Sequence, residues 1–267
     1  MSSWARAAAA FFLPSHCLLC QERALESFFR GGICDGCWNS IPYPADPRCE
    51  LCDEPVTTAD PALCGRCLLD PPEFRSLRSA APYRGSARQL LLLLKFRGAD
   101  YLAPHLARLL VARLAGGELA QEVAAVPARR LERIRRDHAA EILASAVARE
   151  LHLPFAPGRL EKLRQTRRQS GLPLAQRAEN VRGAFGARQG SPARILLIDD
   201  VATSGATARA CARALRRSGA ETVDVWCFAR ASREDEIEAT QSEVRKSELR
   251  SPKSEVDDPT QDLGLRT

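Results

Sequence analysis

Eight of the ten cysteines lie within the first 70 residues, and their spacing is the clearest chemical pattern in the sequence. They form four Cys-x2-Cys pairs, with 13 residues between the first two pairs and 11 between the last two. Two thiolates separated by two residues can reach one metal ion from a tight turn, and two such pairs complete the tetrahedral four-sulfur site of structural zinc. We therefore expect two zinc ions bound by Cys17, Cys20, Cys34, Cys37, Cys49, Cys52, Cys64 and Cys67.

Other chemistry for these thiols is possible in principle. Four disulfides would need an oxidising compartment, whereas the nucleotide-handling pattern described next is typical of a reduced intracellular protein. The paired, ribbon-like spacing favours zinc over an iron–sulfur cluster. The spacing leaves open whether consecutive pairs share an ion or the pairs interleave. Cys211 and Cys227 lie in an expected helix and strand, and are predicted to be ordinary buried residues.

A second pattern joins an apolar run to two carboxylates and a Thr-Ser-Gly turn. The turn opens a helix whose free amide groups and dipole favour a phosphate, and a glycine there allows close approach of the backbone. The carboxylates suit ribose hydroxyls and, indirectly, the Mg2+ of a pyrophosphate ligand. A capped turn without a ligand is the plain alternative, and the P-loop and Rossmann patterns are absent. We expect a phosphoribosyl site at Asp199, Asp200, Thr203, Ser204, Gly205, Ala206 and Thr207.

The elements around this turn predict an α/β domain. Residues 195–198 are uninterruptedly apolar, as in a strand covered on both faces of a parallel sheet, and this strand is expected to end at the two aspartates. The next helix should bury Ala208, Cys211, Ala212 and Leu215 and stop at Gly219, before a strand over residues 222–229. Earlier, residues 123–126 predict a short strand stopped by Pro127, followed by a helix with a stripe of Ala140, Leu143, Ala144, Val147 and Leu151.

Composition divides the chain into three expected parts. Residues 1–70 hold the eight-cysteine zinc module, preceded by a short helix near residues 7–13. Pro71-Pro72 marks a linker into a domain that spans residues 71–231, with helical sequence from Gly85. Residues 232–267 are charged and poor in apolar side chains, which predicts a disordered tail.

Charge indicates an anionic partner. The net charge is +6, and Lys and Arg crowd between residues 129 and 182, which favours phosphate or nucleic acid. A solvated basic face is the plain alternative for many of these arginines. No run approaches the roughly 20 apolar residues of a membrane helix, so we expect a cytoplasmic protein.

The sequence resembles the type I phosphoribosyltransferases, and more narrowly the ComF family of competence-associated proteins. The resemblance spans about residues 10–231 and includes the eight-cysteine module and the 199–207 segment. Its other matching residues are Phe12-Leu13-Pro14, Pro82-Tyr83, Leu94-Lys95-Phe96, Val126-Pro127, Thr166, Gln169, Leu172, Arg177, Asn180 and Gly183-Ala184-Phe185. By resemblance, residues 127–130 are a pyrophosphate-side loop and residues 166–182 a mobile basic hood, which assigns the pyrophosphate or nucleic-acid side to Arg129, Arg130, Arg167 and Arg168.

The chain also departs from the family. It has Arg135-Arg136-Asp137-His138-Ala139 where the family usually reads Arg-Gly-Phe-Asn-Gln, which puts the geometry there in doubt. His138 is interpreted as structural or solvated. Purine phosphoribosyltransferases commonly have an acidic residue at the position of Thr203, and the sequence offers no obvious general base.

The resemblance implies a protein that assists single-stranded DNA uptake in natural transformation, with a helicase-like partner at the membrane machinery. The alternative is an active, Mg2+-dependent phosphoribosyltransferase, a glycosyltransferase that resembles amidophosphoribosyltransferase and uses phosphoribosyl pyrophosphate with an unknown nitrogen acceptor. A regulator that senses a phosphoribosyl ligand is a third hypothesis. Fold alone does not choose among them.

Overall fold

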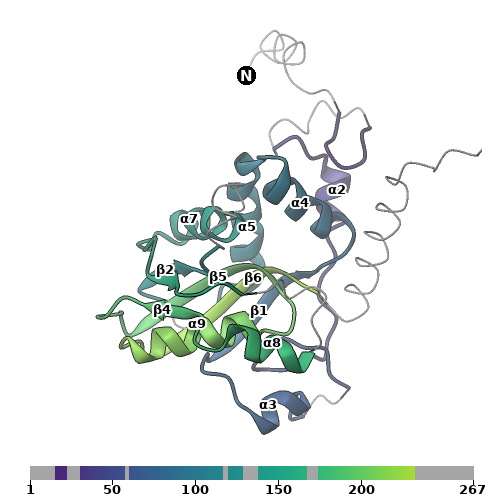
Figure 1. Cartoon of the computed structure of the whole chain (residues 1–267). Coiled ribbons are helices and arrows are strands. Elements are labelled where there is room, and N and C mark those ends of the chain that lie inside the picture. Colours follow the sequence, from purple (N-terminus) through teal and green to yellow (C-terminus); the bar gives the residue numbers. More distant parts are fainter. Residues whose placement is uncertain are drawn as a thin grey trace, which may run out of the picture. The chain divides into compact units, whose positions relative to one another are not determined.

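The computed structural model describes residues 16–22, 31–57, 60–116, 120–128, 138–166 and 174–231. Within them lies a four-stranded parallel sheet with the spatial order β1-β6-β5-β2 (Figure 1). Its strands are β1 (Ser76–Pro82), β2 (Glu122–Ala125), β5 (Arg194–Ala202) and β6 (Thr222–Arg230). Helices cover both faces, so the predicted α/β class with a parallel sheet is confirmed.

The apolar run before the aspartates is buried on both sides, as expected. Leu196 and Ile198 join a core cluster with α4 (Gly85–Phe96), α5 (Ala103–Leu114) and α7 (Ala139–Leu151). Ile195 and Leu197 join a second cluster with α9 (Ala206–Arg217) and with Val181 at the end of α8 (Leu174–Val181). Because side chains alternate between the faces of a strand, only a continuous apolar run can serve two cores.

The strand continues beyond the predicted end. β5 runs to Ala202, because β6 continues beside it and pairs Ala229 with Val201 and Arg230 with Ala202. The two aspartates therefore lie inside the last third of a strand. As adjacent strand residues, they face opposite sides of the sheet.

Other expectations agree with the structure in part. In α9, the four predicted residues are all buried, and Gly219 follows the helix end with a φ of +113°. In α7, Leu143, Ala144 and Val147 are buried, while Ala140 and Leu151 are only partly so. Strand β1, which pairs with β6, was not expected from the sequence.

The remaining elements are short. β3 (Leu160–Lys162) pairs antiparallel with β4 (Phe185–Ala187), and the 3-10 turn η2 (Asp100–Leu102) precedes α5. Two one-turn helices, α2 (Asp35–Asn39) and α3 (Gly65–Leu69), each begin directly after a cysteine. No helix in the described part of the chain is long and apolar enough to cross a membrane. The expected helix at residues 7–13 and the expected tail at residues 232–267 lie outside the described residues.

Candidate functional site

The turn between β5 and α9 has the conformation that the sequence predicted for an anion site. Gly205 is the N-cap of α9 with a φ of +73°, a left-handed conformation that glycine adopts without strain. The space around it is open, so the backbone angle rather than crowding calls for glycine. No side chain caps the first turn of α9, although the Ala206 N–H lies 3.3 Å from the Ser204 hydroxyl oxygen. The remaining first-turn amides can receive an anion.

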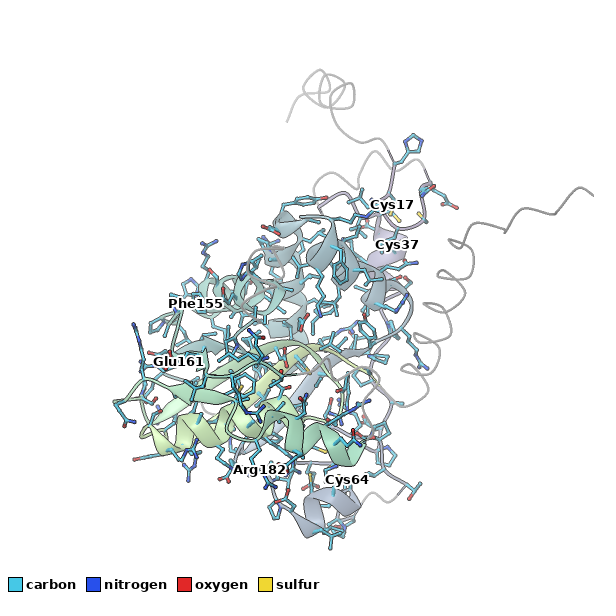
Figure 2. All side chains as sticks on the ribbon, viewed as in Figure 1. Cys17, Cys37, Cys64, Phe155, Glu161 and Arg182 are labelled. Atoms are coloured by element: carbon cyan, nitrogen blue, oxygen red, sulfur yellow. The ribbon has the colours of Figure 1, made fainter. Side chains whose placement is uncertain are left out.

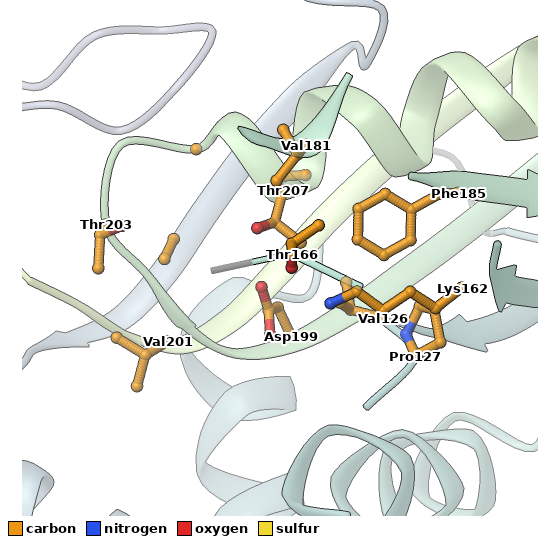
Figure 3. Close-up of a pocket in the computed structure, with 13 residues that line it drawn as sticks. Val126, Pro127, Lys162, Thr166, Val181, Phe185, Asp199, Val201, Thr203 and Thr207 are labelled. Atoms are coloured by element: carbon orange, nitrogen blue, oxygen red, sulfur yellow. The ribbon is translucent and has the colours of Figure 1, made fainter. Parts of the chain in front are cut away.

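A cavity of about 210 Å3 lies in front of this turn (Figure 3). Of the seven predicted phosphoribosyl residues, it is lined by Asp199, Thr203, Gly205 and Thr207. The structure does not place Asp200, Ser204 or Ala206 in its lining. Its other walls come from the residues after β2, from β3 and the segment after it, from the end of α8, from β4, and from the end of β5 and the start of α9. These lining residues are Val126, Pro127, Lys162, Thr166, Val181, Phe185, Val201, Ala202 and Ala208.

The two aspartates differ in environment. Asp199 lines the cavity, and burial raises its pKa to about 6, although the charge of Lys95 on α4 opposes the shift. Asp200 forms an ion pair with Lys95. The sequence analysis predicts the same role for both carboxylates, whereas the pleat of β5 directs Asp199 to the cavity and Asp200 towards α4.

Lys162 is a cavity residue that the sequence reasoning missed. Its ammonium group lies 5.4 Å from the centre of the Phe185 ring, and Figure 3 shows it pointing into the same space as Asp199 and Thr207. Nothing in the short β3 sequence indicated a site, because the neighbours of Lys162 in the cavity come from distant parts of the chain. Phe185 and Lys95 are among the residues that match the family pattern, but the resemblance implies no role for either.

The other predicted site residues are either outside the description or away from this cavity. Arg129, Arg130, Arg167 and Arg168 lie outside the described residues. The His138 Nδ1 atom lies 3.3 Å from a carboxylate oxygen of Glu141, next to a different cavity between α5 and α7. His138 therefore does not line the cavity of Asp199.

The eight cysteines form two groups of consecutive pairs. In each group the sulfur atoms all lie within 4.8 Å of one another. The first cysteine cluster is Cys17, Cys20, Cys34 and Cys37, and the second cysteine cluster is Cys49, Cys52, Cys64 and Cys67.

Zinc fits both clusters. A tetrahedral ion with Zn–S bonds of about 2.3 Å places its sulfur ligands about 3.8 Å apart. The Cys20 and Cys34 sulfurs are separated by 3.8 Å, and those of Cys52 and Cys64 by 3.6 Å. All eight are free thiols, since a disulfide would bring two sulfurs to about 2 Å. Backbone N–H groups of Leu19 and Cys34 also point at the Cys17 sulfur, each at 3.4 Å, as around a bound thiolate.

Comparison with known proteins agrees with this arrangement. Residues 8–68 match the double zinc ribbon domain, and residues 137–261 match the phosphoribosyl transferase domain. The DNA utilization protein YhgH of Salmonella typhimurium is 31% identical over 229 residues, covering 82% of this chain and 98% of that protein. The chain belongs to the ComF family. Competence protein F of Haemophilus influenzae is 27% identical over 231 residues, covering 82% of this ComF protein and 99% of that relative.

Among solved structures, the adenine phosphoribosyltransferase of Leishmania tarentolae is 16% identical, with a TM-score of 0.33. The structural match covers 54% of this ComF protein and 76% of the Leishmania chain.

In this ComF protein, residues beside the second cysteine cluster contact the turn and the first turns of α9. Arg66, between the last two cysteines, donates a hydrogen bond to the backbone carbonyl of Ser204. Arg209, in the first turns of α9, donates to the carbonyl of Asp70 at 2.6 Å, and its other nitrogen lies 3.3 Å from the Cys67 sulfur. Two arginines thus join the zinc ribbon to the turn that begins α9.

Proposed function

We propose that this ComF protein binds a 5-phosphoribosyl group in the cavity in front of α9 and assists single-stranded DNA uptake in natural transformation. The observation that carries the proposal is a single cavity that combines the uncapped first turn of α9 with the carboxylate of Asp199. Family membership supports it, because relatives over most of the chain bear the names DNA utilization protein and competence protein.

The ligand can be oriented from the chemistry of the walls. The phosphate would accept hydrogen bonds from the amides at the start of α9 and from the hydroxyls of Thr203 and Thr207. The ribose hydroxyls would donate to Asp199. Asp199 is the only carboxylate among the described lining residues, so a Mg2+ would come with a pyrophosphate group of the ligand and keep most of its waters.

The second part of the proposal, DNA uptake, is the cellular role of the protein. A cytoplasmic protein that holds a phosphorylated sugar could receive the strand as it enters and pass it to a helicase-like partner at the membrane machinery. The excess of Lys and Arg between residues 129 and 182 supports contact with phosphates.

The test is titration with ribose 5-phosphate and with phosphoribosyl pyrophosphate plus Mg2+, followed by calorimetry and thermal shift. We expect saturable binding to the parent protein, with a rise in melting temperature. Asp199→Asn, alone and combined with Asp200→Asn, should weaken binding at least about tenfold, the size expected for one charged hydrogen bond. Glu150→Gln, an exposed carboxylate change on α7, is the matched control and should bind normally. Lack of binding by the parent protein would refute the proposal.

An active phosphoribosyltransferase is the second candidate, favoured by the ring of Phe185 in the cavity wall beside Lys162. An apolar ring next to the ribose position can support a planar base, and ribosyl transfer depends mainly on positioning and charge stabilisation. The test is pyrophosphate release from phosphoribosyl pyrophosphate in the presence of purines, pyrimidines and ammonia. Binding without release in every mixture would leave the first proposal alone.

A further inference from the structure

A second cavity, of about 500 Å3, lies on the other side of the same turn. It is walled by α3, by the α8–β4 connection and by the outer face of α9. Among the described residues, five arginines line it and Asp70 is the one acidic residue in its lining. We name it the arginine groove, after Arg66, Arg182, Arg209, Arg213 and Arg217.

Three of these arginines form a row. Arg209, Arg213 and Arg217 follow one another at intervals of four residues along α9. Residues four apart lie on the same face of a helix, with a rise of about 6 Å between them. Such a row presents positive charge at regular intervals and suits a ligand whose negative charges also repeat.

The arginines divide into wall and binding positions. Arg66 and Arg209 are held by the Ser204 carbonyl and by Asp70, so they form the floor next to the zinc ribbon. Arg213 is half exposed and lies 3.1 Å from a carboxylate oxygen of Glu73. Arg217 is exposed and has no ion-pair partner in the described part of the chain.

Arg182, after α8, adds charge from the opposite wall. Its pair with Glu179, at 3.2 Å, has both side chains largely exposed and is therefore weak.

Favourable placement at a helix end explains only part of this pattern. Basic residues in a last turn interact well with the helix dipole, which accounts for Arg216 and Arg217. It does not account for Arg213 in the middle of α9, or for Arg182 on another element. Like charges that converge on one cavity repel one another, so an anionic ligand would relieve the repulsion.

The groove and the phosphoribosyl cavity share their dividing wall. Ser204 and Ala206, two of the three predicted residues that do not line the first cavity, line the groove instead, while Val181 and Phe185 line both. A chain of sugar phosphates could therefore place one group on each side of the turn.

We propose that the arginine groove binds the phosphate backbone of single-stranded nucleic acid, next to the phosphoribosyl site. This inference rests on the proposed function and deepens it by naming a surface for the strand. Contacts to phosphates carry no sequence information directly, so recognition of the backbone by these arginines should be independent of sequence.

The test compares two double charge reversals by fluorescence anisotropy with a labelled thymidine oligonucleotide. Arg213→Glu with Arg217→Glu changes the groove. Arg108→Glu with Arg149→Glu makes the same change of net charge on α5 and α7, which cover the other face of the sheet. We expect affinity to fall at least tenfold in the groove variant and less than twofold in the control. The salt dependence of log K should also become shallower by about 1.4 when two phosphate contacts are lost.

Ribose 5-phosphate binding by the same variants separates this inference from the proposed function. Retained ribose 5-phosphate binding with equal oligonucleotide loss in both double variants would overturn the groove and leave the phosphoribosyl site intact. The converse result is oligonucleotide binding that depends on the groove, together with no ribose 5-phosphate binding by the parent protein. It would support the groove and refute the phosphoribosyl proposal. Failure of the parent protein to bind the oligonucleotide at low salt would also overturn the groove. So would displacement of the labelled oligonucleotide by polyglutamate as readily as by unlabelled oligonucleotide.

Discussion

Asp199 and Asp200 show how one residue step changes the role of a carboxylate. The two are consecutive in β5, so the strand directs them to opposite faces. Asp200 is compensated by Lys95, while Asp199 stays in the cavity with a raised pKa. Burial of a carboxylate in a cavity disfavours its charged form and so destabilises the free protein. Such strain is typical of binding positions, where the ligand provides the missing partners.

Replacing Asp199 with asparagine should therefore stabilise the protein at neutral pH. The pKa of Asp199 is about 6 in the folded chain against 3.8 for an ordinary aspartate, so between these values the folded state binds more protons than the unfolded state. Stability conferred by this group accordingly falls as pH rises from about 4 to about 6. Asp199→Asn removes the penalty, and its advantage should grow with pH and level off near about 1–3 kcal/mol.

The measurement is urea unfolding of the parent protein and of Asp199→Asn between about pH 4.5 and 7.5. The difference between their free energies of unfolding cancels the contributions of all other titrating groups. Asp200→Asn is the matched neighbour and should have the opposite effect, because it removes the carboxylate charge that forms an ion pair with Lys95. An advantage of Asp199→Asn that shrinks as pH rises would contradict the assigned pKa shift.

At the scale of elements, the sequence was informative where apolar residues decide the structure. The β5–α9–β6 unit follows from a strand buried on both faces and a helix with one apolar stripe. Strand β1 escaped prediction because polar residues interrupt its pattern, and two of these, Ser76 and Ser79, have distant partners. Ser76 donates to Asp224 of β6 at 2.9 Å, and the Ser79 N–H donates to Asp53 of the zinc ribbon at 2.9 Å. Partners that lie so far away in sequence leave no local signal.

The contact between Asp53 and β1 should be a main attachment of the zinc ribbon to the sheet. Asp53 is 1% exposed and accepts hydrogen bonds from the Ser79 backbone and hydroxyl and, at 2.7 Å, from Arg48. Removal of the carboxylate leaves the Ser79 N–H and hydroxyl buried without this acceptor, and takes from Arg48 one of its two carboxylate partners. We expect Asp53→Ala to lower the free energy of unfolding by about 3 kcal/mol in urea titrations of the zinc-loaded protein.

Asp46→Ala provides the control for this prediction. Asp46 binds the same arginine, Arg48, at 2.9 Å, but its own side chain is 78% exposed. Exposed pairs contribute less than about 1 kcal/mol, so this variant should unfold almost as the parent does. Equal losses in the two variants would assign the effect to Arg48 alone and not to the buried attachment.

At the scale of the whole molecule, the two cysteine clusters belong to different cores. Cys17 packs with α4 and α5, whereas Cys49, Cys52 and Cys67 pack with α9 and with Ala202 and Ala206 around the turn. Figure 2 shows Cys17 and Cys37 towards the top of the view and Cys64, the N-cap of α3, towards the bottom. The sequence predicted the eight ligands but left their pairing open. It also gave no sign that the second cluster reaches the 199–207 segment, because Arg66 and Ser204 are 138 residues apart.

Loss of the second cluster should therefore loosen the turn, while loss of the first should not. Cys64→Ser and Cys20→Ser should each reduce the zinc content from two ions to one per chain. In hydrogen exchange, Cys64→Ser should speed exchange at the first turn of α9, because α3 would no longer hold Arg66 against the Ser204 carbonyl. Ribose 5-phosphate binding should weaken by about tenfold, the size of one charged hydrogen bond. Cys20→Ser should leave both measurements unchanged.

Arg66→Met separates the zinc ion from the hydrogen bond that acts on the turn. Methionine keeps most of the side-chain length but cannot donate to the Ser204 carbonyl, and Arg66 is not a metal ligand. The variant should retain two zinc ions and still reproduce the faster exchange and weaker binding of Cys64→Ser. Normal exchange in Arg66→Met, together with fast exchange in Cys64→Ser, would show that general unfolding of the ribbon loosens the turn. Normal exchange in both would mean that the zinc ribbon and the turn are independent of each other.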